Sequence, residues 1–285
     1  MTDPAARFGI NTYSYTRSHK AEDCLRHLAG RGYRHFEVMM IPGHFWPTGA
    51  GGSEALARVA AAEGLRIVSL NMPNVDYNIA ALAEEAREYA LGIVERMVRA
   101  AGALGASAVI FGPGKANPFF PAPGEELAGH FHRALDRLAP LAEAAGTRLL
   151  VENLPVAFLP DAESMMNTLD AYGNERIGIC YDVANAHFIG EDLGVGLRRV
   201  ASRLGLVHAS DTTRALYRHD KVGAGDVPFA SIPPVLEEIG YRAVPVLEII
   251  TTENPDAAID DGVCRLGEMG WTREHAPPAR DNAAV

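Results

Sequence analysis

The feature that most constrains the fold is a regular alternation of short apolar runs with longer amphipathic stretches. A short run that is apolar at nearly every position is typical of a strand buried on both faces, as in a parallel sheet. The runs recur about every 30–40 residues, which is the usual length of one βα unit. They cover residues 8–12, 35–39, 67–71, 108–112, 149–153, 177–182, 206–210 and 244–250.

The stretches between these runs are predicted to be helices. Residues 82–104 and 127–145 carry apolar side chains near a 3.6-residue period, and a glycine follows each stretch. Gly105 and Gly146 at these positions are typical of helix C-caps. Asp161 is expected to cap the helix after the fifth run, and Pro255 is expected to begin the last helix.

Eight such units in a chain of 285 residues predict a single (β/α)₈ TIM barrel. The alternative is an open doubly wound sheet, but the glycine-rich motif that usually follows its first strand is absent. We expect the barrel to span residues 1–271. Residues 272–285, which contain Pro277 and Pro278, are expected to form a loose C-terminal tail.

Charge and composition exclude several classes of partner. Lys and Arg number 26 against 36 Asp and Glu, and a formal net charge of −10 disfavours binding to nucleic acid or to an anionic membrane. No apolar run reaches the length of about 18 residues that a transmembrane helix needs. Residues 1–7 lack the apolar segment of a signal peptide, and the three cysteines form no CxxC pair. We therefore expect a cytoplasmic protein that acts on a small molecule.

The last four apolar runs each end in a residue that can bind a metal ion. In a TIM barrel the C-terminal ends of the strands converge on the catalytic face. One carboxylate there is most often a cap or an ion-pair partner, but four such residues on adjacent strands indicate a shared cation, because buried charges need a partner. Three carboxylates and one imidazole predict one divalent ion, with Mn²⁺ favoured and Mg²⁺, Co²⁺, Zn²⁺ or Fe²⁺ as alternatives. The four residues are Glu152, Asp182, His208 and Glu248.

The same segments resemble the xylose isomerase-like TIM barrel superfamily, which contains sugar phosphate isomerases and epimerases. The resemblance covers about residues 8–270 and implies that the four residues above are metal ligands. It also implies that Arg214, six residues after His208, binds substrate. The segments that carry it are 151–153, 181–185, 207–212, 219–229 and 246–248.

Two departures separate this chain from the epimerase branch of that superfamily. Asn185 stands three residues after Asp182, where that branch often has a histidine. Segment 153–158 lacks the second glutamate that ketose epimerases tend to have after the residue that corresponds to Glu152. These departures argue against a generic ketohexose 3-epimerase. The additional histidines of the three-zinc AP endonuclease branch are also missing.

The predicted ligand set indicates acid–base chemistry at a carbon next to a carbonyl. A divalent ion can stabilise an enediolate while Glu152 and Glu248 act as an acid/base pair that removes and returns a proton. This predicts a metal-dependent isomerase or epimerase of a small sugar, keto-sugar or polyol. A dehydratase of an inosose-like substrate on the same site is the alternative. A barrel subunit that depends on a partner chain is a third hypothesis, against which the complete ligand set argues.

Further polar and aromatic residues near the strand ends are candidates for binding the carbohydrate. Trp46 is one, because an aromatic ring can stack on a sugar face. Three of them also have a structural explanation: a buried ion pair for Glu37, packing for Trp46, and solvation for Arg214. The sequence allows a homo-oligomer and does not identify the sugar. The candidates are Arg214, His219, His187, Glu37, Trp46 and Asn11.

Overall fold

The computed structural model describes residues 7–48, 52–74 and 76–271, so the expected C-terminal tail lies outside the described residues. Eight parallel strands form a closed barrel in the order β1 to β8, which confirms the single TIM barrel and excludes the open sheet. The strands are β1 (Gly9–Asn11), β2 (His35–Met39), β3 (Arg66–Asn71), β4 (Ala108–Phe111), β5 (Arg148–Glu152), β6 (Gly178–Asp182), β7 (Leu204–Ala209) and β8 (Val246–Leu247).

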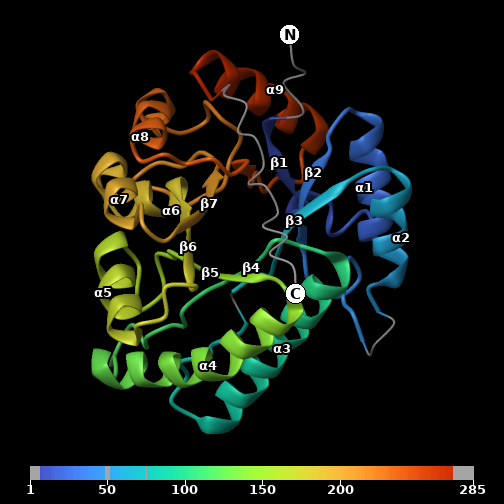
Figure 1. The fold of residues 1–285 in the computed structure, drawn as a ribbon. Coiled ribbons are helices and arrows are strands. Elements are labelled where there is room, and N and C mark those ends of the chain that lie inside the picture. The colour runs from blue at the N-terminus through green and yellow to red at the C-terminus, as the bar shows by residue number, and fades with distance from the viewer. Residues whose placement is uncertain (1–6, 49–51, 75, 272–285) are drawn as a thin grey trace.

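Helices surround the strands, as Figure 1 shows. Hydrogen bonds join the first and last βα units; among them, Tyr15 donates to Asp256 at 2.6 Å and Tyr33 donates to Asp260 at 2.7 Å. Within the described part of the chain, no helix is long and apolar enough to cross a membrane. The helices are α1 (Ala21–Gly30), α2 (Glu54–Ala62), α3 (Glu84–Leu104), α4 (Gly124–Ala145), α5 (Ala162–Tyr172), α6 (Val183–Phe188), α7 (Leu193–Val200), α8 (Ile232–Glu238) and α9 (Pro255–Glu268), with short 3₁₀ turns η2 (Tyr13–Tyr15) and η3 (Phe229–Ser231).

The helix ends follow the capping signals of the sequence. Gly105 and Gly146 end α3 and α4 with φ of 64° and 66°, a left-handed conformation that glycine adopts without steric cost. Asp161 caps α5 by accepting the Ser164 amide at 2.8 Å. The Ser164 hydroxyl in turn accepts from the Asp161 amide, which completes a capping box.

Buried apolar side chains form two layers, one outside the strands and one inside the barrel. The larger layer lies between the strands and the helices, and Val151, Ile179 and Val207 belong to it. The smaller layer fills the inside of the barrel, and its buried members are Ala108, Ile110, Leu150, Cys180, Leu206 and Val246.

Side chains along each strand point alternately to the outer layer and to the inside of the barrel, and this alternation places the predicted ligands at the mouth of the barrel. Residues two apart on a strand share one face, so a residue two positions after an inward one also points inward, nearer the C-terminal end. Glu152 therefore follows Leu150, Asp182 follows Cys180, His208 follows Leu206, and Glu248 follows Val246 on the inner face.

The last strand is shorter than the predicted run over residues 244–250. Only Val246 and Leu247 form β8. Beyond them the Glu248 amide still donates to Ala209 of β7, at 3.1 Å, but the Ile250 amide donates to the His219 carbonyl at 2.8 Å. The backbone therefore leaves the barrel to pair with the loop after β7, which brings His219 to the same end as Glu248.

Candidate metal centre

Four buried side chains converge at the C-terminal ends of β5 to β8. Glu152, Asp182, His208 and Glu248 each offer a ligand atom, and these atoms all lie within 4.8 Å of one another. The parallel register aligns Asp182 with His208 on the neighbouring strand. The exposed fraction of each of the four residues is 5% or less, so water screens their charges poorly.

The imidazole of His208 lies among the three carboxylates. Its Nδ1 atom is 2.9 Å from Glu152 Oε1, 3.3 Å from Glu248 Oε2 and 3.8 Å from Asp182 Oδ2. One nitrogen and three carboxylate oxygens therefore face a common space.

Burial controls the protonation of these groups. Burial raises the pKa of Glu152 to about 7. The nearby His208 lowers this pKa, whereas the negative charges of Glu248 and Asp182 raise it further. Burial likewise raises the pKa of Glu248 to about 7. Burial opposes the charged form of His208, but Cys180, Glu37 and Glu248 favour it and raise the pKa of His208 well above its usual range.

The donor set fits a divalent cation. Asp182 Oδ2 is buried without a hydrogen-bond partner among the described residues, although Asp182 Oδ1 accepts the Asn185 amide at 2.7 Å. A buried carboxylate oxygen without a donor is costly unless a cation lies beside it. Three carboxylates and one neutral imidazole are ligands suited to Mn²⁺, Mg²⁺, Co²⁺ or Zn²⁺.

Cys180 lies close enough to form an alternative group with Glu152 and His208. Burial raises the pKa of the Cys180 thiol well above its usual range. Since a metal ion binds the thiolate rather than the thiol, the carboxylate set is the better ligand set.

Two asparagines hold the strands that carry the cluster. Asn153 Nδ2 donates to the Asp182 carbonyl at 3.0 Å, and Asn153 Oδ1 accepts the Asp182 amide at 2.7 Å. Asn185 donates to the Asn153 carbonyl at 2.8 Å. Asn185, which departs from the histidine of the resembling proteins, therefore has a structural role here.

The structure buries Glu37 and Asn11 beside the cluster, in contact with His208 and Glu248. Glu37 is fully buried, with His208 Nε2 at 3.1 and 3.2 Å from its two oxygens. Burial opposes ionisation of Glu37, but His208 and hydrogen bonds from Ser69 and Asn71 lower its pKa. Asn11 is 1% exposed and donates to Glu37 and Glu248. Both side chains are thus occupied by protein partners.

The loop between β7 and α8 brings His219 and Tyr217 to the cluster. His219 Nδ1 lies 3.4 Å from Glu248 Oε2 and 3.8 Å from Asp182 Oδ2. Tyr217 donates its hydroxyl to Asn185 Oδ1 at 2.6 Å and lies 3.1 Å from His219 Nε2. Burial and the nearby carboxylates raise the pKa of Tyr217, so it stays a neutral donor.

Buried Asp211 shapes this loop. Its carboxylate accepts the amides of Gly223 at 2.7 Å and Val227 at 3.2 Å. His187 ties the same loop to α6, because its Nε2 lies 2.7 Å from Asp226 Oδ1. His187 thus contacts the loop and not the four-residue cluster.

Neither Arg214 nor Trp46 makes a hydrogen bond, ion pair or ring contact with the four clustered side chains among the described residues. Arg214 is exposed and makes no hydrogen bond or ion pair with another described residue. The Trp46 ring faces the guanidinium of Arg96 on α3, at 5.4 Å, and packs against the outer apolar layer. These contacts fit the packing explanation for Trp46, and stacking of this ring on a sugar stays a prediction.

Sequence reasoning did not select Tyr217 or Ser69 as functional residues. Ser69 was detectable, since it is a polar residue inside an apolar run, as Glu37 is. No periodic pattern marks Tyr217, which lies in an irregular loop.

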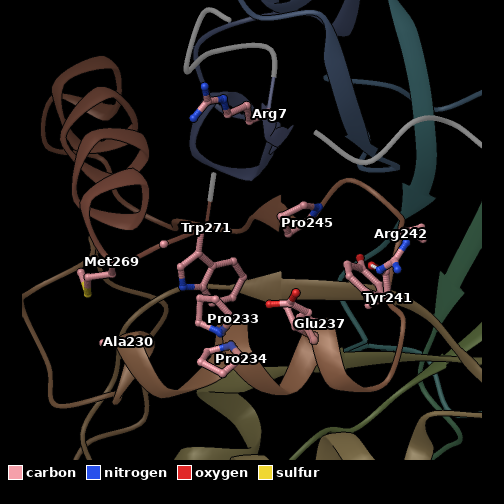
Figure 2. Close-up of a pocket in the computed structure, with 12 residues that line it drawn as sticks. Arg7, Ala230, Pro233, Pro234, Glu237, Tyr241, Arg242, Pro245, Met269 and Trp271 are labelled. Atoms are coloured by element: carbon pink, nitrogen blue, oxygen red, sulfur yellow. Dashed lines mark hydrogen bonds between the residues drawn. The ribbon is translucent and has the colours of Figure 1, made fainter. Parts of the chain in front are cut away.

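A surface pocket lies at the opposite end of the barrel (Figure 2). Arg7 precedes β1 and Pro245 precedes β8, so the pocket is at the N-terminal ends of the strands. Trp271 forms part of its wall and donates to the Phe229 carbonyl at 3.1 Å. The four clustered side chains lie at the other ends of the strands, where TIM barrels carry their chemistry.

Two curated proteins resemble the chain over part of their lengths. An uncharacterised protein of Methanocaldococcus jannaschii is 23% identical over 195 residues, which is 64% of each chain. An L-ribulose 3-epimerase of Mesorhizobium japonicum is 27% identical over 111 residues, which is 38% of this chain and 36% of the epimerase. The alignments thus span less than two thirds of both curated relatives.

Solved structures share the fold over nearly the whole chain. A D-tagatose 3-epimerase-like protein has a TM-score of 0.80 at 20% identity, covering 92% of this chain and 96% of that one. The IOLI protein with a bound zinc atom has a TM-score of 0.75 at 16% identity, covering 92% and 96%. The family model described as xylose isomerase-like TIM barrel matches residues 25–269. The chain therefore belongs to the xylose isomerase-like TIM barrel family.

Proposed function

We propose that the chain is a divalent-metal-dependent epimerase or isomerase of a small sugar or keto-sugar. The observation that carries the proposal is the convergence of Glu152, Asp182, His208 and Glu248 within 4.8 Å at the catalytic end of the barrel. The names of the similar proteins, L-ribulose 3-epimerase and D-tagatose 3-epimerase-like protein, support a ketose as substrate.

We propose Mn²⁺ as the ion, held by these four residues. A bound divalent cation would polarise the carbonyl and hydroxyl oxygens of a substrate and stabilise the negative charge of an enediolate. Zn²⁺ is the first ion to compare with it, because the IOLI protein binds zinc.

Glu152 and Glu248 are the proposed acid/base pair. Without a cation, burial raises the pKa of each carboxyl to about 7, and a bound divalent cation would favour the ionised carboxylate of both. One of the two groups, as a carboxylate, removes the proton from the carbon next to the carbonyl. The other group, in its protonated form, donates a proton. Donation to the opposite face of the same carbon gives an epimer, and donation to the neighbouring carbon gives an aldose–ketose isomer.

Tyr217 and His219 are proposed to orient the substrate. Both are polar side chains beside the carboxylates, and Tyr217 is 39% exposed, so it is accessible from solvent. Their hydroxyl and imidazole groups can exchange hydrogen bonds with sugar hydroxyls.

The proposal is tested with metal-stripped protein reloaded with Mn²⁺ and incubated with L-ribulose, D-tagatose and D-psicose. We expect about one equivalent of bound Mn²⁺ and a new sugar isomer in the products. Glu152→Gln and Glu248→Gln should abolish turnover, and exposed Glu63→Gln is the control for loss of a charge. Full activity without metal would refute the mechanism. An inosose is incubated in the same way, and its loss of water, with no new isomer from the ketoses, would replace the epimerase with a dehydratase.

A further inference from the structure

A buried hydrogen-bond network centred on Glu37 joins strands β1, β2 and β3 of the barrel. Glu37 lies in β2, where the parallel register aligns it with Asn11 of β1 and Ser69 of β3. Its residue exposure is 0%. A carboxylate at such a position has no access to a substrate and must be satisfied by protein groups.

Four donors surround this carboxylate. Ser69 Oγ donates to Glu37 Oε2 at 2.6 Å. Asn11 and Asn71 donate to Glu37 Oε1 at 2.6 and 3.1 Å. The fourth donor is His208 Nε2, which lies 3.1 and 3.2 Å from the two oxygens. An ionised carboxylate only accepts hydrogen bonds, so the set of donors matches its charge.

This contact determines which nitrogen of His208 carries a proton. Without a cation Nδ1 also lies 2.9 Å from a carboxylate oxygen, so both nitrogens can carry protons there. Glu37 only accepts hydrogen bonds, so in a ring that has given up its Nδ1 proton to bind a cation the remaining proton stays on Nε2. In the neutral ring Nδ1 then carries the lone pair, and Nδ1 is the atom that lies 2.9 to 3.8 Å from the three carboxylates. The ring is thereby both oriented and held in the tautomer that binds a cation.

The same network reaches a second ligand. Asn11 Nδ2 lies 3.1 Å from Glu248 Oε1, and Asn71 Nδ2 lies 3.5 Å from the same oxygen. Each amide therefore links Glu37 to Glu248.

We infer that Glu37 is a positioning residue that sets the affinity of the centre for a divalent cation, by fixing the tautomer of His208 and the orientation of Glu248. It acts through other residues and does not contact the substrate. The inference rests on the metal centre of the proposed function, but it holds for any substrate.

The first test compares Mn²⁺ binding to wild-type protein and Glu37→Gln, with Glu63→Gln as the matched surface control. A glutamine amide presents N–H groups where Ser69 and His208 also donate, so it favours the wrong tautomer of the ring. We expect Glu37→Gln to weaken Mn²⁺ binding about 10- to 100-fold in calorimetry. The visible absorption spectrum of bound Co²⁺ should change as well. Glu37→Asp, which keeps the charge, should recover part of the affinity.

The outcomes separate this inference from a purely structural role. If Glu37 only stabilised the barrel, Glu37→Gln would lower the melting temperature and leave Mn²⁺ affinity and the Co²⁺ spectrum of the folded protein unchanged. That result would overturn the inference and leave the proposed function intact. Wild-type protein that binds no Mn²⁺ would refute both.

A second measurement needs no variant at Glu37, in case Glu37→Gln does not fold. Nitrogen NMR of ¹⁵N-histidine-labelled, Zn²⁺-loaded wild-type protein identifies the protonated ring nitrogen of His208, and the signal is assigned by its loss in His208→Gln. We expect a protonated Nε2 and a zinc-bound Nδ1. A zinc-bound Nε2 with a protonated Nδ1 would contradict the role of Glu37.

Discussion

Metal-free protein should lose stability as the pH rises through neutrality, and bound Mn²⁺ should remove this loss. The perturbation is removal of the cation from the cluster that holds Glu152 and Glu248. Each carboxyl has its pKa raised from an ordinary value of 4.5 to about 7 by burial. Such a group stabilises the fold while it is protonated, so its contribution is fully present below about pH 4.5 and is lost as the pH passes about 7.

The magnitude follows from the pKa difference. A change from 4.5 to about 7 corresponds to roughly 3 kcal/mol for one group, at 1.36 kcal/mol for each tenfold change in proton affinity. The raised pKa of His208 acts in the same direction at higher pH. In a domain of this size, roughly 3 kcal/mol lowers the melting temperature by about 6 °C or more.

The assay is thermal unfolding with EDTA and with excess Mn²⁺ at several pH values from about 5.5 to about 7.5. Mn²⁺ binds the ionised ligands, so its stabilising effect should grow as the pH rises. Metal-free Glu152→Gln should lose less stability over this range than wild-type protein, and Glu63→Gln should behave as wild type. A Mn²⁺-induced rise in melting temperature that is equal at all pH values would refute the reasoning.

Three further predictions concern single side chains. Asp182→Asn should weaken Mn²⁺ binding at least about 100-fold while keeping the fold, since its buried Oδ2 lacks a donor; calorimetry and circular dichroism measure the two effects, and unchanged affinity would exclude Asp182 as a ligand. Tyr217→Phe, which removes the 2.6 Å hydrogen bond to Asn185, should raise KM for the active ketose about 10-fold. Arg214→Ala should change KM less than about twofold, because Arg214 makes no such contact. A larger change in KM for Arg214→Ala than for Tyr217→Phe would contradict the proposed role of Tyr217. Leu135→Ala, in the fully buried outer layer, should destabilise the protein by about 2–5 kcal/mol in denaturant unfolding, and a loss of Mn²⁺ affinity in the folded variant would contradict separate roles for core and site.

The barrel was predictable because its strands are buried on both faces. A run such as Leu149–Val151, apolar at each position, excludes a strand with one face in water. Because residues two apart on a strand share one face, the position of Glu152, Asp182 and His208 near the ends of their apolar runs predicts that they meet at the C-terminal end of the barrel. The end of β8 was not predictable, because the backbone after Glu248 leaves the barrel and Ile250 pairs with the loop at His219, a long-range contact that no local pattern encodes.

The partner of Glu37 also escaped prediction. A buried ion pair was one of the two explanations for this carboxylate in an apolar run, but its partner His208 lies on β7, 171 residues away. Which side chains meet across a barrel depends on strand tilt and stagger, and these are properties of the closed sheet. The β7–α8 loop escaped prediction for another reason: Asp211 shapes it by accepting amides 12 and 16 residues further along the chain.

The central claim, that this centre moves a proton at a carbon next to a carbonyl with the help of a divalent ion, is tested most directly by isotope exchange. Mn²⁺-loaded protein is incubated with L-ribulose, D-tagatose or D-psicose in D₂O, and the recovered sugars are examined by NMR and mass spectrometry. We predict deuterium on the carbon next to the carbonyl in an isomer of the substrate, and none after treatment with EDTA or in Glu152→Gln. Equal exchange in EDTA-treated protein, or an isomer formed without deuterium, would contradict the account.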